Sequence, residues 1–152
     1  MRTTLTLLAA LGSAALLLGA LGFQYIGGLA PCHLCYLQRY PHAAAVAIGV
    51  LALAFRARIL CLLGALAAAA SGVVGIYHTG VERHWWQGPT TCTSGSVSGL
   101  STDQLMDQIL SAPVVQCDQV AWAFLNLSMA SWNAIFSFAL ALLWIAAYNA
   151  RR

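Results

Sequence analysis

Residues 5–23 read LTLLAALGSAALLLGALGF and contain no charged side chain. A helix that crosses the hydrocarbon of a bilayer needs roughly 17 to 25 mainly apolar residues, so this run is long enough to span a membrane. The whole chain of 152 residues is 61% hydrophobic and only 7% charged, whereas about a quarter of the residues in soluble domains are charged. So few charges could not cover a water-facing surface of this size. The composition therefore predicts a membrane protein.

Three further apolar runs follow the first. The predicted spans are residues 5–23, 41–55, 59–77 and 131–148, joined on the outside by loops of about residues 24–40 and 78–130. The second run is short and can cross if the arginines at its ends extend toward water or the local bilayer thins. We count it as a span because without it the third run would face the wrong way. The chain is thus expected to be all-α, a single domain built as a bundle of four transmembrane helices.

The arginines predict the orientation of this bundle. With both termini in the cytoplasm, the inner segments carry five arginines and the outer loops two, as the positive-inside rule requires. The inner ones are Arg2, Arg56, Arg58, Arg151 and Arg152, and the outer ones are Arg39 and Arg83. The outer side is then the periplasm of a bacterium, where disulfides persist. A cleaved signal peptide is the alternative for the first run, but such peptides have shorter apolar regions, of about 7 to 15 residues.

The long second outer loop contains one signal for a helix. Ser101-Thr-Asp-Gln104 has the pattern of a capping box, and an apolar stripe at helical spacing follows it. The stripe consists of Leu105, Met106, Ile109 and Leu110. We expect a short amphipathic helix that lies flat on the membrane surface or packs on the loop itself.

Four of the five cysteines fall in the predicted outer loops. Cys32 and Cys35 form a Cys-x-x-Cys motif, whose small ring gains little from closure and therefore suits a disulfide that opens and closes. Cys92 and Cys117 are far apart, and a disulfide between them could be purely structural, worth about 3 kcal/mol. Four thiolates would also suit zinc, but zinc sites usually present two close pairs. Cys61, at the inner end of the third span, is expected to be a small apolar filler.

Three other side chains are candidates for the chemistry of this site. Arg39 follows Cys35 by four residues, on the same face of a helix, where its charge would favour the thiolate; the alternative is an arginine that only anchors the helix at the interface. His78 ends the third span on the same side and could donate a hydrogen bond or relay protons, or could be structural. His42 and His78 could instead ligate a haem, because both are expected at about the same depth in the membrane, but one pair of histidines is weak evidence for this.

Taken together, these residues resemble the disulfide bond formation protein B (DsbB) family of quinone-dependent thiol oxidases. The resemblance covers the whole chain, with Cys-x-x-Cys-x-x-x-Arg in the first outer loop and two separated cysteines in the second. Further similar motifs are Tyr77-His78-Thr79-Gly80-Val81-Glu82, Trp86-x-Gly88-Pro89 before Cys92, and Trp122-x-Phe124-Leu125-x-Leu127-Ser128-Met129 after Cys117. Asn126 departs from the family, in which we expect glycine to be common at this position.

The resemblance implies an enzyme of the bacterial inner membrane that reoxidises a DsbA-like periplasmic dithiol carrier and passes the electrons to ubiquinone or menaquinone. It implies that the carrier attacks Cys92 of a Cys92–Cys117 disulfide, that Cys117 then attacks Cys32, and that Cys35 is released beside the quinone.

Arg39 would stabilise this thiolate and the quinone, and His78 would help to bind or protonate the ring. The resemblance implies no metal, and the scattered arginines predict no nucleic-acid partner. Two alternatives stay open: a non-enzymatic membrane protein, such as an assembly factor, whose outer loop is stapled by a disulfide, and a haem- or zinc-binding membrane protein.

Overall fold

The computed structural model describes residues 1–89, 101–103, 106 and 116–150. Within these residues the chain forms four long helices and one small hairpin. Their order is α1 (Arg2–Tyr25), α2 (His33–Phe55), α3 (Ile59–Glu82), β1 (Ala123–Phe124), β2 (Leu127–Ser128) and α5 (Met129–Asn149). Cys92 and most of the short helix predicted after Ser101 lie outside the described residues.

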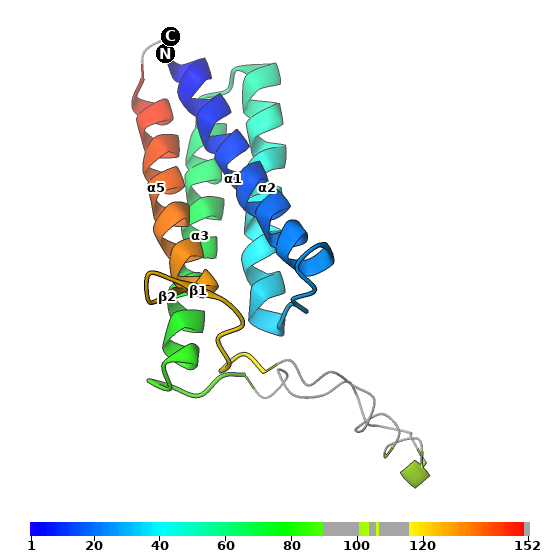
Figure 1. Ribbon diagram of the computed structural model, residues 1–152. Coiled ribbons are helices and arrows are strands. Elements are labelled where there is room, and N and C mark those ends of the chain that lie inside the picture. Colours follow the sequence, from blue (N-terminus) through cyan, green and yellow to red (C-terminus); the bar gives the residue numbers. More distant parts are fainter. Residues whose placement is uncertain (90–100, 104–105, 107–115, 151–152) are drawn as a thin grey trace.

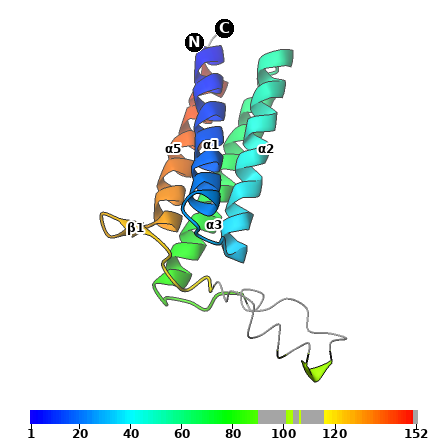
Figure 2. The ribbon, with the colours of Figure 1, turned by 45° about the vertical axis from the view of Figure 1, so that its right-hand side comes forward.

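The four helices run side by side as one bundle (Figures 1 and 2). α3 packs against α2 and most extensively against α5, while α1 packs against α2 and α5. Both chain termini and the α2–α3 turn lie at one end of the bundle, and the hairpin and the start of α2 lie toward the other (Figure 1). The predicted all-α architecture is confirmed.

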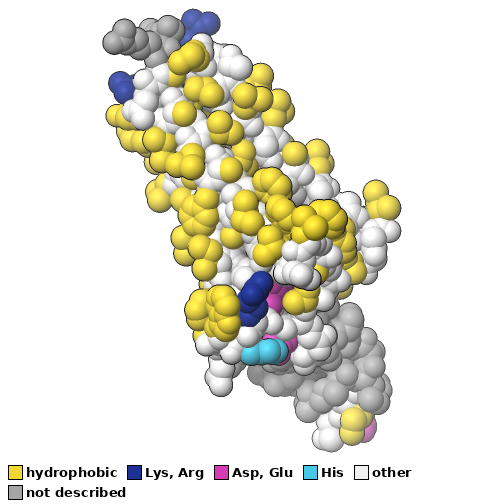
Figure 3. All heavy atoms as spheres, turned by 60° about the vertical axis from the view of Figure 1, so that its left-hand side comes forward, with side chains coloured by type: hydrophobic (Ala, Val, Ile, Leu, Met, Phe, Trp, Pro, Cys, Tyr) yellow, Lys and Arg dark blue, Asp and Glu magenta, His cyan; other side chains and the backbone are white. Residues whose placement is uncertain are grey.

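Three of the described helices, α1, α3 and α5, are long and apolar enough to cross a membrane. α2 does not meet this standard, because its first part carries polar side chains, among them Gln38, Arg39 and His42. Four spans therefore stay a prediction. Figure 3 agrees with a membrane setting, since the charged side chains visible on that face gather toward the two ends of the bundle and apolar side chains cover the length between them.

α2 begins at His33, eight residues before the predicted second span (residue 41 minus residue 33). The apolar pattern did not reveal this start, because the helix extends beyond its apolar part and is capped by the thiol of Cys32, which accepts a hydrogen bond from the backbone N–H of Cys35. The helix continues through Pro41, although proline lacks a backbone donor.

The hairpin that leads into α5 turns at Leu125 and Asn126, with φ of 52° and 61°. β1 and β2 pair antiparallel through Ala123 with Ser128 and Phe124 with Leu127. Two successive positive φ angles are the mark of a type I′ turn, which favours asparagine and glycine. Asn126 therefore suits its position although it differs from the glycine expected in the family.

Candidate redox site

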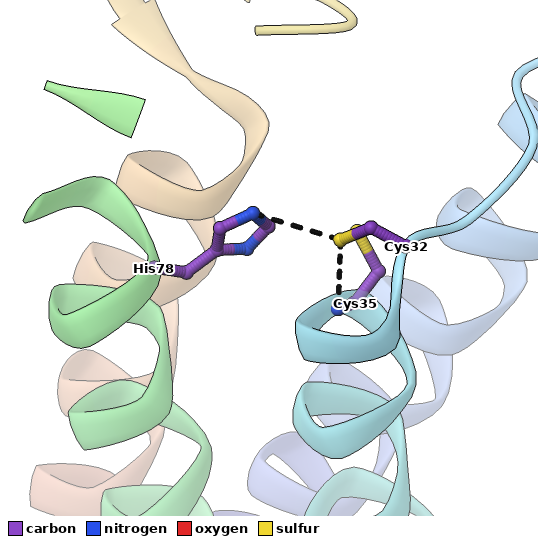
Figure 4. A group of neighbouring side chains, drawn as sticks. All are labelled: Cys32, Cys35 and His78. Carbon is purple, nitrogen blue, oxygen red and sulfur yellow. Dashed lines mark hydrogen bonds between the residues drawn. The ribbon is translucent and has the colours of Figure 1, made fainter. Parts of the chain in front are cut away.

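The thiol pair lies at the N-terminus of α2, at the end of the bundle away from the chain termini (Figure 1). The Sγ atoms of Cys32 and Cys35 are 2.7 Å apart, and the backbone N–H of Cys35 donates to Cys32 Sγ over 3.2 Å (Figure 4). Both cysteines are free thiols. The exposed N–H groups and the dipole of a helix N-terminus favour a thiolate there. A pair this close can form a disulfide after a small movement of the side chains.

The two thiols are not equivalent. A hydrogen bond from Cys32 is the main cause that lowers the pKa of Cys35 to about 7, against burial, and the charge of Arg39 lowers it further. The pKa of Cys32 is raised, first by its hydrogen bond with Cys35 and second by burial. When the pair is reduced, the first proton therefore leaves from Cys35, and this cysteine becomes the thiolate.

His78 reaches this pair from α3. Its Nε2 lies 3.6 Å from Cys32 Sγ (Figure 4), and its Nδ1 lies 2.8 Å from Nε2 of Gln38. The same Gln38 nitrogen donates to the backbone carbonyl of Leu34 over 3.3 Å, which identifies it as the amide nitrogen. Because Gln38 donates to Nδ1, the neutral imidazole carries its proton on Nε2. His78 is thereby set to donate toward Cys32.

Glu82 stands behind His78 on the same face of α3. Its Oε1 is 3.9 Å from His78 Nε2, its side chain is 6% exposed, and its Oε2 has no hydrogen-bond partner within the described part of the chain. Sequence reasoning missed both Gln38 and Glu82 as functional candidates. The signal for Glu82 was present, because residues four apart on a helix lie next to each other.

Cys117 lies against the same thiols. It is 2% exposed and belongs to one buried cluster with Cys32, Leu34 and Val81, against which Cys35 packs. A backbone hydrogen bond also joins Cys117 to the ring of His78. Cys117 is disulfide-bonded. The structure thus brings together three of the four predicted site cysteines, and the fourth, Cys92, is outside the described residues.

A mainly apolar cavity of about 420 Å³ extends from the thiol pair into the bundle. The side chains that line it come from α1, α2, α3, α5 and the hairpin, and include Cys35, Arg39, His42, Phe23, Trp122 and Trp132. Arg39 is tied to α1 through Gln24 and the carbonyl of Ala20 and stacks on Tyr36. The guanidinium predicted near Cys35 therefore lies in the same cavity wall as this thiol.

The cluster of Cys32, Cys35 and His78 is also the one place in the described residues where three ligand atoms lie close enough to hold a metal, within 4.8 Å of one another. Two thiolates on a tetrahedral zinc, each bound at about 2.3 Å, stand about 3.8 Å apart. The 2.7 Å between these two sulfur atoms is much shorter. The geometry favours a redox pair over a zinc site. Nε2 of His42 bonds to Asn133, and Nδ1 of His78 bonds to Gln38, so these two ring nitrogens are already paired and not free to ligate a haem.

Membrane-type helices, a close thiol pair with one lowered pKa, and a disulfide-bonded cysteine packed against it define a membrane thiol–disulfide oxidoreductase. Residues 2–147 match the family model of Disulfide bond formation protein DsbB. The chain belongs to the DsbB family, and it is a membrane protein of disulfide bond formation.

Relatives in several bacteria agree with this membership. The chain is 33% identical over 142 residues to Disulfide bond formation protein B 2 of Pseudomonas aeruginosa, covering 88% of this chain and 83% of the relative. It is 35% identical over 147 residues to Disulfide bond formation protein B of Methylococcus capsulatus, covering 87% and 85%. Disulfide bond formation protein B of Marinobacter nauticus is 31% identical over 136 residues, covering 81% and 77%. No solved structure matches the chain. Family and spans together identify a protein of the bacterial inner membrane.

Proposed function

We propose that this protein oxidises a DsbA-like periplasmic dithiol carrier and passes the electrons to a membrane quinone. One observation carries the proposal: Cys35 lies in the wall of an apolar cavity within the helices, while its neighbour Cys32 packs against the disulfide-bonded Cys117. The thiol pair therefore stands between a second disulfide and a space suited to an apolar acceptor.

The first exchange takes place at the second cysteine pair. We assign Cys92 as the partner of Cys117, since the other three cysteines are free thiols. The thiolate of the reduced carrier attacks Cys92, a bond forms between the two proteins, and Cys117 leaves as a thiolate. The second thiolate of the carrier then attacks the first, so that the carrier leaves as a disulfide and Cys92 is released as a thiolate.

The second exchange joins the two pairs. Cys117 attacks Cys32 of an oxidised Cys32–Cys35 pair, a bond forms between Cys117 and Cys32, and Cys35 leaves as a thiolate. The thiolate of Cys92 then attacks Cys117, which re-forms the Cys92–Cys117 disulfide and releases Cys32 as a second thiolate. The Cys32–Cys35 pair now holds the two electrons of the carrier. Burial of Cys117 in one cluster with Cys32 supports the attack of Cys117 on Cys32. Cys35 is the better leaving group, because a thiol whose pKa is about 7 leaves faster than one whose pKa is raised.

The cavity lining fits the quinone that the family implies. Its walls are mainly apolar and aromatic, and Arg39 and the thiol of Cys35 supply polar groups in the wall. When bound, a quinone accepts two electrons and two protons and becomes a quinol. The cation of Arg39 favours negative charge on both Cys35 and a ring oxygen, and His78, with its proton on Nε2, helps to bind or protonate this end of the site.

The membrane arrangement belongs to the same proposal. We propose that α2 crosses as the fourth span, with residues 41–55 in the hydrocarbon, that both termini are cytoplasmic, and that both cysteine pairs face the periplasm. The single membrane domain then covers residues 1–152. This arrangement gives the water-soluble carrier access to Cys92 and the lipid-soluble acceptor access to the cavity.

Quinol formation by the purified protein tests the proposal. A reduced DsbA-like carrier is supplied with a ubiquinone or a menaquinone analogue, and quinol is followed by absorbance. We expect activity in the unsubstituted protein and in Cys61→Ser, whose thiol lies at the inner end of α3, and its loss in Cys32→Ser, Cys35→Ser, Cys92→Ser and Cys117→Ser. Quinol formation that persists in Cys35→Ser, or that is absent with every reduced carrier, would sink the proposal.

A further inference from the structure

A second buried polar network lies deeper in the bundle than the thiol pair. The hydroxyl of Ser71 on α3 donates to the backbone carbonyl of Gln38 over 2.9 Å. The side-chain amide of Asn133 on α5 donates through Nδ2 to Ser71 Oγ over 3.1 Å and to the Ser71 carbonyl at 3.5 Å. A backbone carbonyl can only accept, so the direction of each bond is set. Asn133 is therefore held with its oxygen, Oδ1, turned to its other neighbour.

That neighbour is His42 of α2. Its Nε2 lies 3.1 Å from Asn133 Oδ1 and also 3.1 Å from the hydroxyl of Ser137. An amide oxygen only accepts hydrogen bonds, so His42 Nε2 carries a proton. Both partners are uncharged and His42 is 2% exposed, which favours the neutral imidazole. The other ring nitrogen, Nδ1, is then a bare acceptor.

Nδ1 of His42 is buried and has no hydrogen-bond partner in the described part of the chain. Leaving a buried acceptor unpaired costs about 1 to 3 kcal/mol, so such groups in folded proteins are nearly always satisfied. The network around His42 pairs its other nitrogen, Nε2, and thereby fixes the orientation of the ring. What is missing is one hydrogen-bond donor at this place.

His42 lines the same cavity as Cys35 and Arg39, and its Nδ1 is covered by protein atoms. A donor in the cavity therefore reaches this nitrogen when the side chains around it move. Cys35, Arg39 and His42 stand at positions i, i+4 and i+7 on one face of α2. Seven residues of helix rise about 10 Å, so the cavity carries polar groups at two levels, near the thiol and two turns deeper.

We propose that His42 Nδ1 accepts a hydrogen bond from a hydroxyl of the quinol, the reduced form of the acceptor. The inference rests on the proposed function. When the carrier dithiol becomes a disulfide, two electrons and two protons are lost, and the two carbonyl oxygens of the quinone take them up as two hydroxyls. A carbonyl oxygen cannot pair with a bare acceptor, but a hydroxyl can. His42 therefore stabilises the reduced ring relative to the oxidised ring and favours electron transfer from Cys35.

Two substitutions of His42 separate this role from a structural one. In His42→Gln the amide nitrogen takes the place of Nε2, so the bond to Asn133 is kept and the Nδ1 acceptor is lost. In His42→Asn the amide takes the place of Nδ1, so an acceptor is kept and the bond to Asn133 is lost. His84→Gln, the same change at an exposed histidine beyond the end of α3, is the matched control.

The measurement is equilibrium binding of a short-chain ubiquinone and of its quinol, each followed by quenching of tryptophan fluorescence in the purified protein. We expect His42→Gln to bind quinol about tenfold more weakly, the effect of losing one hydrogen bond worth about 1.4 kcal/mol, while quinone binding changes by less than about twofold. His42→Asn should bind quinol more tightly than His42→Gln does, and His84→Gln should bind both forms as the unsubstituted protein does.

Two other outcomes are informative, one against the role of Nδ1 and one against the quinone site itself. If His42→Gln binds quinol as tightly as the unsubstituted protein, or loses both forms equally, the role of Nδ1 is wrong while the proposed function stands. If the unsubstituted protein binds neither form, the quinone site itself is wrong, and this inference falls with it.

Discussion

The two thiols of the Cys-x-x-Cys motif differ because of their places at the start of one helix. Cys32 caps α2 and donates to Cys35, whereas Cys35 lies inside the first turn, with Arg39 on the same face. The Cys-x-x-Cys motif in the sequence does not show that the two thiols differ in pKa. Only the helix start, which lies before the apolar run, gives them different pKa values.

The pH dependence of alkylation tests this difference. In the reduced protein, the thiolate of Cys35 is the reactive form, so its rate of alkylation by iodoacetamide should rise with pH, with a midpoint at about 7. Cys32→Ala removes the main cause of the lowered pKa, so the midpoint should move up toward the ordinary value of 9.0. Mass spectrometry of the peptide that contains Cys35 follows the reaction.

Arg39→Gln is the companion variant. It should also raise the midpoint of Cys35 alkylation, but by less than Cys32→Ala does, because the charge of Arg39 lowers the pKa of Cys35 less than the hydrogen bond from Cys32 does. A midpoint that stays at about 7 in Cys32→Ala would show that the hydrogen bond from Cys32 does not set the pKa of Cys35.

Helix packing depends on small residues where α3 meets α5. A Cβ added at Gly64 would lie 2.6 Å from ring atoms of Trp144, which is fully buried. Near the other end of α3, a Cβ at Gly75 would meet Ala134 and the backbone of α5 at 3.1 Å. Small residues let membrane helices approach closely and gain dispersion contacts. This contact holds α3, and with it His78, in place.

The pair Gly64→Ala and Gly19→Ala tests this packing. Alanine at Gly64 forces Trp144 to move, so we expect a loss of about 1 to 3 kcal/mol in the free energy of unfolding. Gly19 has open space around it, so alanine there should be neutral or stabilise the helix by up to about 1 kcal/mol. Thermal unfolding of both variants in the same detergent is the measurement. An equal effect of the two substitutions would contradict close packing at Gly64.

Across the whole molecule, three arginines, Arg2, Arg56 and Arg58, lie at the opposite end of the bundle from the redox site. At the end with the termini, Arg2 donates to the carbonyl of Arg56, and Arg58 donates to the carbonyl of Tyr148 over 2.6 Å. These bonds satisfy carbonyls at the helix ends and leave positive charge there. This separation agrees with the proposed orientation, in which the termini face the cytoplasm.

Labelling of single cysteines tests whether α2 crosses the membrane. In a variant whose natural cysteines are all replaced by serine, Ile26→Cys places a thiol in the loop before α2, and Ala57→Cys places one in the turn after it. A membrane-impermeant maleimide should label Ile26→Cys in cells whose outer membrane is permeable, and Ala57→Cys only after lysis. Labelling of both in unlysed cells would show that α2 does not cross.

Much of the architecture could be predicted because membrane helices obey a local rule. Any run long and apolar enough to cross the hydrocarbon forms a helix, since its backbone groups must bond internally. The runs at residues 5–23, 59–77 and 131–148 all lie within observed helices. The start of α2 was missed because residues 33–40 are too polar for this rule. Gln38 and Glu82 were missed for a similar reason, since isolated polar residues at the edge of a span look like residues in contact with water.

The sequence by itself determined the membrane class, the helices, the thiol pair and the family, because composition, run length and cysteine spacing are properties of neighbouring residues. Only the tertiary structure decided that Cys117 packs on Cys32 and that Gln38 fixes the tautomer of His78. It also decided that Asn133 pairs with Nε2 of His42, whose Nδ1 has no hydrogen-bond partner among the described residues. These contacts join different helices or a helix and a loop. They depend on how each helix is rotated and how closely small residues let the helices approach, and this follows from packing of the whole bundle.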